Sequence, residues 1–190
     1  SQVFMKKQYY ALKASLPMLL FDEMPPLSSA AFLGYCEAYL SPAKQTFLKE
    51  LTLAPRSVPA DSNAQVMRKY TAWEICLRNT LARLRAAKLS VDPEPYVVKF
   101  ADYETTAASA AQSVFSMNAD PLEKEKALDR ARWDFLESME WNHAFDFDAL
   151  CIYRSKLLIL EKWAARRKGN AAEILDEAAA RSEQKTEKTE

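Results

Sequence analysis

The single histidine is the residue of this chain best suited to acid–base or metal chemistry. His143 stands in a short segment with four nearby carboxylates, Glu137, Glu140, Asp146 and Asp148. One imidazole with several carboxylates could hold a hard or borderline metal ion. Their spacing matches neither an EF-hand loop nor the repeated Glu-x-x-His pairs of metal-binding helical bundles. Helix capping and turn formation explain the same residues, so we expect no metal here.

Other residue types that carry chemistry are scarce. A cysteine–histidine nucleophile pair would need Cys36, Cys76 or Cys151 to meet the histidine, but each lies in an apolar stretch typical of a buried helix interior. These cysteines are expected to be buried, reduced thiols, as in a cytoplasmic protein. The chain has 2 glycines and 1 histidine, which excludes phosphate-binding glycine-rich loops and HExxH zinc sites. The sequence therefore predicts no enzyme and no cofactor.

A second group of functional side chains lies on one helix. Residues 77–85 read Leu-Arg-Asn-Thr-Leu-Ala-Arg-Leu-Arg, so that Arg78 and Arg85 share one face, and Asn79 and Arg83 share another. This pattern suits a surface that binds carboxylates of a protein partner, or a solvated face with internal salt bridges. No aromatic side chains are interleaved for stacking bases, which disfavours nucleic acid as the partner. The candidate partner-binding residues are Arg78, Asn79, Arg83, Arg85, Trp141, His143 and Asp146.

Charge is balanced overall and uneven locally. The 190 residues include 26 basic and 26 acidic side chains, so no general attraction to nucleic acid or membranes is expected. Residues 62–89 carry six bases and one acid, residues 92–148 five bases and thirteen acids, and residues 149–168 six bases and one acid. Either the basic helices pack beside an acidic one, or acidic and basic faces bind different partners.

The elements that must position these residues are helices. Apolar side chains recur at alternating three- and four-residue steps, with caps at Ser28 or Ser29, Ser41, Asp120, and Asp146 or Asp148. They predict helices at about 29–40, 42–54, 62–89, 103–117, 121–140 and 147–167. The fold class is thus all-α, a bundle of about five to six helices within one domain, residues 1–168. Residues 9–15 carry paired aromatics before Pro17 and suit a short extended segment.

The last of these helices has an unusually wide apolar face. That face comprises Leu150, Ile152, Tyr153, Leu157, Leu158, Ile159, Leu160, Trp163 and Ala164. Such a helix lies centrally in the bundle or packs against a partner. Lys168 and Gly169 then predict the end of the helix, and residues 169–190 are expected to form an Ala-, Glu- and Lys-rich tail, helical at first and then flexible.

Several stretches carry a family resemblance. They are Tyr-Tyr-Ala-Leu-Lys-Ala-Ser-Leu-Pro at 9–17, Phe-Asp and Pro-Pro within 21–26, Arg-Asn-Thr-Leu-Ala-Arg-Leu-Arg-Ala at 78–86, Asp-Arg-Ala-Arg-Trp-Asp-Phe-Leu at 129–136, Phe-Asp-Phe-Asp at 145–148, and residues 156–164. Together they resemble a bacterial family of unknown function whose genes lie among those of V-type ATP synthases. The Arg-Asn-x-Leu-x-x-Leu-Arg helix is also distantly similar to the C-type (eukaryotic d-type) linker component of V/A-type ATPases, an all-helical socket between rotor stalk and membrane ring.

The resemblance implies a non-catalytic rotor linker or assembly protein. Its partners would be stalk or ring proteins of a V-type ATP synthase, and its location would be cytoplasmic, peripheral to the inner membrane through that complex. The alternative is a free-standing helical adaptor or a self-associating interaction module, which the wide apolar face of residues 150–164 favours.

Overall fold

The computed structural model of the protein describes residues 2–58, 64–100 and 104–187. Every regular element of these residues is a helix and none is a strand, which confirms the predicted fold class. The helices are α1 (Gln2–Ser15), α2 (Ser29–Glu37), α3 (Pro42–Glu50), α4 (Gln65–Leu89), α5 (Thr105–Ser116), α6 (Pro121–Glu140) and α7 (Phe147–Glu187), with a short 3-10 turn at Glu94–Tyr96. No helix of this described part combines the length and apolarity that crossing a membrane requires.

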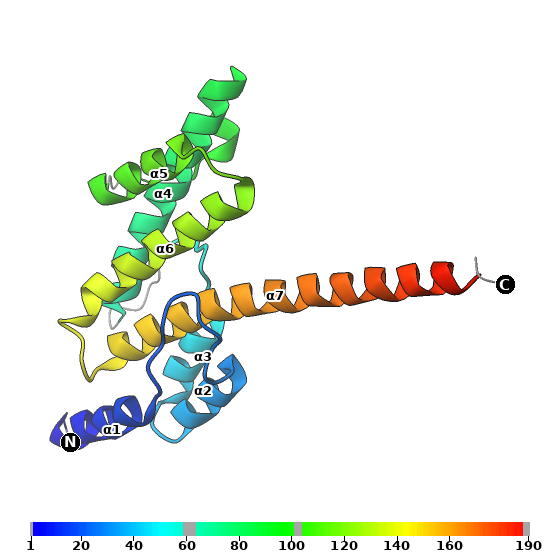
Figure 1. Ribbon diagram of the computed structural model, residues 1–190. Coiled ribbons are helices and arrows are strands. Elements are labelled where there is room, and N and C mark those ends of the chain that lie inside the picture. Colours follow the sequence, from blue (N-terminus) through cyan, green and yellow to red (C-terminus); the bar gives the residue numbers. More distant parts are fainter. Residues whose placement is uncertain (1, 59–63, 101–103, 188–190) are drawn as a thin grey trace.

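Helix α7 is the axis on which the other helices are arranged. Its first half lies between two groups, α1 to α3 on one side and α4 to α6 on the other (Figure 1). Its second half projects away from both groups into solvent (Figure 1). The body of the protein is therefore two helical layers joined by one shared helix.

Helix α1 corrects the prediction of an extended N-terminal segment. Residues 9–15 are helical, and Leu12 is buried in the core with Tyr9 and Leu16 packed beside it. Tyr9 and Leu12 are three residues apart and lie on one helical face, and Leu16 follows directly after the end of the helix. The helix ends before Pro17 because the residue preceding a proline is disfavoured in helical geometry.

The start of α6 follows the sequence signals closely. The side chain of Asp120 accepts a hydrogen bond from the Glu123 amide at 2.8 Å, and the Glu123 carboxylate accepts one from the Asp120 amide at 3.2 Å. Pro121 occupies the first turn, where its missing amide hydrogen costs nothing. This reciprocal capping sets where α6 begins, and hence which of its side chains face the neighbouring helices.

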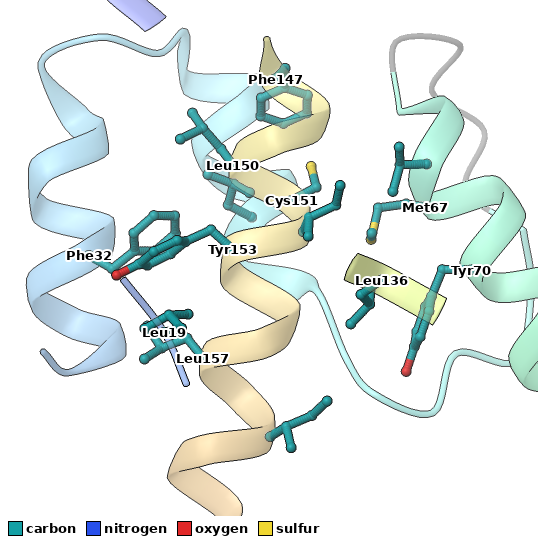
Figure 2. Close-up of a cluster of buried hydrophobic side chains, with 14 of the residues drawn as sticks. Leu19, Phe32, Met67, Tyr70, Leu136, Phe147, Leu150, Cys151, Tyr153 and Leu157 are labelled. Carbon is teal, nitrogen blue, oxygen red and sulfur yellow. The ribbon is translucent and has the colours of Figure 1, made fainter. Parts of the chain in front are cut away.

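The wide apolar face of α7 is covered on both sides within the chain. Figure 2 shows Tyr153 beside Phe32, whose rings stack at 5.2 Å, and Met67 and Leu136 on the opposite side of the helix. The side chains from Leu150 to Tyr153, and Leu157, Ile159 and Leu160, are buried. The helix therefore lies centrally in the bundle, which was one of the two predicted placements. The apolar face with which an adaptor was expected to bind its partner is not exposed.

A second core holds the α4 to α6 layer together. Trp73 of α4 stacks on Phe135 of α6 with ring centroids 4.8 Å apart, and Leu77 packs with the small side chains Ala107 and Ala111 of α5. Alanine on α5 lets that helix lie close along α4. Because α4 is held on these sides, its remaining face is the one that carries the basic residues toward solvent.

The end of α7 differs from the prediction. Lys168 and Gly169 do not stop the helix, which continues without interruption to Glu187. No glycine has a positive φ, so Gly169 does not adopt the left-handed geometry of a helix-ending glycine. A glycine inside a helix costs about 1 kcal/mol relative to alanine. The Ala- and Glu-rich residues that follow are strong helix formers and offset this cost.

Candidate docking surface

A buried cluster of charges connects α4, α6 and α7. Arg132 of α6 donates two hydrogen bonds to Glu74 of α4, at 2.9 and 2.8 Å, and a third to Asp129 at 2.7 Å. Glu74 and Asp129 are both 0% exposed. The other oxygen of Asp129 accepts hydrogen bonds from Lys162 and from the Trp163 indole of α7, each at 2.8 Å. Three helices are thus joined through two fully buried carboxylates.

This cluster has a structural role. Burial alone would lower the pKa of the Arg132 guanidinium, but the hydrogen bonds and negative charge of Glu74 raise it, so Arg132 remains cationic. Both carboxylates have hydrogen-bonded partners, and both are fully buried. Replacing such a pair by apolar side chains often costs no stability, whereas removing one partner alone is strongly destabilising. Sequence reasoning missed the cluster, although a lone acid within the basic residues 62–89 was a visible signal.

The charge pattern along the chain is explained by the same packing. The acidic helix α6 lies against basic α7, and Glu125 forms ion pairs of 2.7 Å with both Lys162 and Arg166. Lys156 lies 3.4 Å from Glu137 and 3.1 Å from Glu140. The hydrogen bonds from Lys162 and Arg166 hold the pKa of Glu125 below its ordinary value. The prediction that basic helices pack beside an acidic one is confirmed.

Two of the four polar residues singled out on α4 are engaged inside the chain. The Arg78 guanidinium lies 3.3 Å from Glu74 and donates a hydrogen bond to the Pro55 carbonyl. The Asn79 amide donates to the Val98 carbonyl and accepts from the Val98 amide, both at 2.8 Å, and its residue is only 7% exposed. Arg78 fixes the chain before α4, and Asn79 fixes the chain after it.

Arg83 and Arg85 are both exposed but face in different directions. Two residues apart on a helix, they project about 200° apart. Arg85 borders a groove of about 500 Å³ beside the C-terminal half of α4. The groove is lined by Arg78, Leu81, Ala82, Arg85, Ala86, Leu89, Val91 and Tyr96. Arg85 also borders a second hollow of about 380 Å³ between α4, α5 and α6. It therefore stands on the ridge between two concave surfaces.

The groove beside Arg85 is rich in apolar side chains that are left in solvent. Leu89 and Tyr96 are among the most exposed large apolar residues of the described chain, and Val91 is also exposed. Exposed apolar residues beside arginine are typical of protein interfaces, where tyrosine and arginine are enriched. We call the groove and its arginine rim the α4 groove.

The turn between α6 and α7 brings His143 and two aspartates together. The Nδ1 atom of His143 lies 2.8 Å from Asp146 and 3.6 Å from Asp148. Asp146 accepts a hydrogen bond from the Ala149 amide at 2.9 Å, so it caps α7, and Asp148 accepts one from the Val66 amide at 3.3 Å. Burial raises the pKa of Asp148, against the opposing effect of that amide. The three side chains could reach one cation, their ligand atoms lying within 4.8 Å of one another, but their bonds serve to cap α7 and join it to α4.

Trp141 lies apart from the α4 groove. It is 93% exposed at the end of α6, while nearby Phe145 contacts Tyr10 of α1 with ring centroids 4.7 Å apart. The structure therefore does not unite the predicted partner-binding residues in one site. It places Arg85 in the α4 groove, Arg83 on another face, and Trp141, His143 and Asp146 at the α6–α7 turn.

Comparison with known proteins places the chain in a family. No curated protein and no solved structure matches it. Residues 58–178, from the segment before α4 to the projecting part of α7, match the model of the DUF2764 family, described as a protein of unknown function. The matched residues contain α4, α5 and α6 in full, and so both the α4 groove and the buried charge cluster. Since the match covers more than half of the chain, the protein belongs to the DUF2764 family.

Proposed function

We propose that the protein is a non-catalytic docking component of a bacterial V-type ATP synthase, and that the α4 groove is the surface through which it binds. The observation that carries the proposal is the groove itself. Apolar side chains lie exposed along one side of α4, and the cation of Arg85 stands at their edge. A surface of this composition suits protein binding better than it suits catalysis.

The groove defines the chemistry of the segment that would bind there. Leu81, Leu89 and Tyr96 offer an apolar floor, which a partner would cover with leucine- or phenylalanine-like side chains. Arg85 would pair with an aspartate or glutamate flanking those side chains, through a bidentate hydrogen bond. The partner segment is therefore an amphipathic helix of a stalk or ring protein, with acidic residues beside its apolar face.

The choice of complex rests on the sequence resemblance. The Arg-Asn-x-Leu-x-x-Leu-Arg stretch that resembles the synthase-associated proteins is the helix that lines the groove. A component linking moving parts must also resist deformation. The two close-packed cores and the charge cluster across α4, α6 and α7 supply that stiffness to the helix bearing the groove.

The test is purification of the tagged protein, expressed at its natural level in its own cell, with mass spectrometry of what co-purifies. Recovery of stalk or ring proteins with the wild type is expected. Arg85→Glu should lower that recovery at least tenfold, whereas Arg83→Glu should leave it unchanged, because Arg83 faces away from the groove. Rising salt should weaken the interaction if Arg85 forms an ion pair.

Two results would contradict the proposal. The synthase assignment is lost if the purified complex lacks the protein and deletion of its gene leaves ATP-driven ion pumping intact. The docking surface is wrong if Arg85→Glu and Arg83→Glu lower recovery equally. Recovery of an unrelated protein through the α4 groove would favour the free-standing adaptor instead.

A further inference from the structure

The turn between α6 and α7 brings three side chains that can bind a metal to one point. His143, Asp146 and Asp148 stand where the chain leaves α6 and enters α7 (Figure 1). One ligand atom from each lies within 4.8 Å of the others. Asp148 also reaches α4, through its hydrogen bond with the Val66 amide, so the cluster lies where three helices meet.

Helix capping uses only one oxygen of each aspartate. Oδ1 of Asp146 accepts a hydrogen bond from the Ala149 amide at 2.9 Å, and Oδ1 of Asp148 accepts one from the Val66 amide at 3.3 Å. The two Oδ2 atoms both face the Nδ1 atom of His143, at 2.8 Å from Asp146 and 3.6 Å from Asp148. The backbone amides thus hold both carboxylates in place and leave a second oxygen of each directed at the imidazole.

The second oxygen of Asp148 is enclosed without a hydrogen bond. The side chain of Asp148 is 9% exposed. Within the part of the chain that the structure describes, its Oδ2 atom accepts no hydrogen bond, because 3.6 Å from Nδ1 is beyond hydrogen-bond distance. A carboxylate oxygen left this way in a nearly buried position costs free energy. A cation between the two aspartates and the histidine would remove that cost.

The charges at this turn leave an excess of negative charge. Two carboxylates face one histidine, whose ring is neutral whenever it binds a metal. The N-terminus of α7 carries about half a positive elementary charge, which offsets about a quarter of the two carboxylates. Lys69 of α4 acts on Asp148 as well, from an exposed position. A divalent cation matches the two carboxylates in charge.

The donor set and its spacing suit a transition metal. Zn²⁺ binds histidine nitrogen and carboxylate oxygen at about 2.0–2.2 Å, so two ligands of a tetrahedral site lie about 3.4 Å apart. The distances of 2.8 and 3.6 Å between Nδ1 and the two Oδ2 atoms lie on either side of that value. A proton on Nδ1 would leave to solvent as the metal takes its place. Three protein ligands leave a fourth position for water.

We propose that His143, Asp146 and Asp148 bind a divalent transition-metal cation of the Zn²⁺ class, which ties the α6–α7 turn to α4. The spacing of these residues in the sequence did not predict a metal, because spacing does not show which way each carboxylate turns. The site shares no residue with the α4 groove and does not depend on the proposed function.

The first experiment measures binding of Zn²⁺ to the full-length protein, without a histidine tag, by isothermal titration calorimetry. The wild type is expected to bind one Zn²⁺ per chain. Mg²⁺, which prefers oxygen ligands alone, should bind about tenfold or more weakly. The native cysteines are buried and do not compete.

Conservative variants separate metal binding from capping. Asp146→Asn and Asp148→Asn each keep an oxygen that accepts the backbone amide, and replace the other oxygen by an NH₂ group that cannot bind a metal. Each should weaken Zn²⁺ binding by about tenfold or more, as loss of even an outer partner of a metal ligand does. Asp134→Asn is the matched control. It removes an exposed acid paired with Arg130 and should leave binding unchanged.

The second experiment uses His143 as a reporter, because the chain contains 1 histidine. Two-bond ¹H–¹⁵N correlation spectra of the ring should show that Zn²⁺ shifts the Nδ1 resonance. Absence of Zn²⁺ binding to the wild type would overturn the proposal. Equal binding by the wild type and both asparagine variants would do the same, because the metal would then lie elsewhere. A ring that responds to pH and not to Zn²⁺ would also overturn it, because the site would then take only a proton.

Discussion

Removing Arg132 tests whether the buried charge cluster holds the helical layers together. The substitution Arg132→Met keeps an unbranched side chain of similar length and deletes the cation. Glu74 and Asp129 lose three hydrogen bonds of 2.7 to 2.9 Å, in a site where both carboxylates are fully buried. Water cannot replace those bonds without opening the packing between α4 and α6.

The expected cost follows from what remains near each carboxylate. Removing one partner of a buried pair typically destabilises a protein by about 3–5 kcal/mol. Asp129 keeps its bonds to Lys162 and Trp163, and Glu74 keeps Arg78 at 3.3 Å, so compensation is partial. We therefore expect Arg132→Met to lower the free energy of unfolding by about 3 kcal/mol, the lower end of that range.

Adding the second substitution separates uncompensated charge from lost packing. The double variant Arg132→Met with Glu74→Met also removes the Glu74 carboxylate of α4, so this carboxylate is no longer buried without its cation. The double variant is expected to be more stable than Arg132→Met alone by at least about 1 kcal/mol. Arg130→Met is the matched control. Arg130 pairs with Asp134 in the same helix, both side chains are 54% exposed, and the substitution should cost less than about 1 kcal/mol.

The assay is equilibrium unfolding in urea, followed by circular dichroism and by tryptophan fluorescence. Coincidence of the two transitions checks that unfolding is two-state. If Arg132→Met costs no more than the Arg130→Met control, the cluster is not a buried ion pair in solution. Glu74→Met alone completes the double-mutant cycle. If the double variant loses the sum of the losses in Arg132→Met and Glu74→Met, the two charges do not act on each other, and the reasoning from uncompensated burial is refuted.

Three further outcomes are expected. Asn79→Ala should lower the free energy of unfolding by about 1–3 kcal/mol and speed hydrogen exchange of the Val98 amide, since both of its bonds to Val98 are lost; unchanged exchange would contradict this. The lowered pKa of Glu125 contributes stability above the ordinary glutamate pKa of about 4.3, and this is lost as pH falls through its folded value. Glu125→Gln should therefore be less stable than the wild type at pH 7 and equal to it in acid, and a gap that persists in acid would be inconsistent with the shift. Burial raises the pKa of the Cys36 thiol to about 12, so a disulfide reagent at pH 8 should label it only on unfolding, and rapid labelling of the native protein would argue against burial.

Capping residues and apolar spacing predicted most of the helices, because the start and the exposed face of a helix depend on residues that are close in the sequence. Asp120 caps α6 through an amide three residues away, and the apolar steps along α4 repeat within each turn. The same kind of signal was misleading at Gly169. A glycine ends a helix when the chain turns away there, but here the residues that follow favour helix, and α7 continues. In residues 9–15, adjacent aromatics fit strand and helix equally well, and only burial of Leu12 against the core decides.

The candidate site was predictable only in part. The spacing along the helix showed that Arg78 shares a face with Arg85. It did not show that Arg78 donates a hydrogen bond to the Pro55 carbonyl. Nor did spacing show that Val98 returns to cover Asn79, leaving Arg85 as the cation at the groove. These contacts join residues about twenty positions apart. The loops between them carry no short-range sequence pattern from which their paths could be predicted.

By itself, the sequence determined that the protein is all-helical and where most helices begin. These features follow from capping and periodicity, whose partners are at most four residues away. Only the tertiary structure decided that Glu74 and Arg132 meet, 58 residues apart, and that the wide face of α7 is covered within the chain. Such pairings depend on how distant segments fill space together, and a side chain is buried or exposed only once every neighbouring helix is in place.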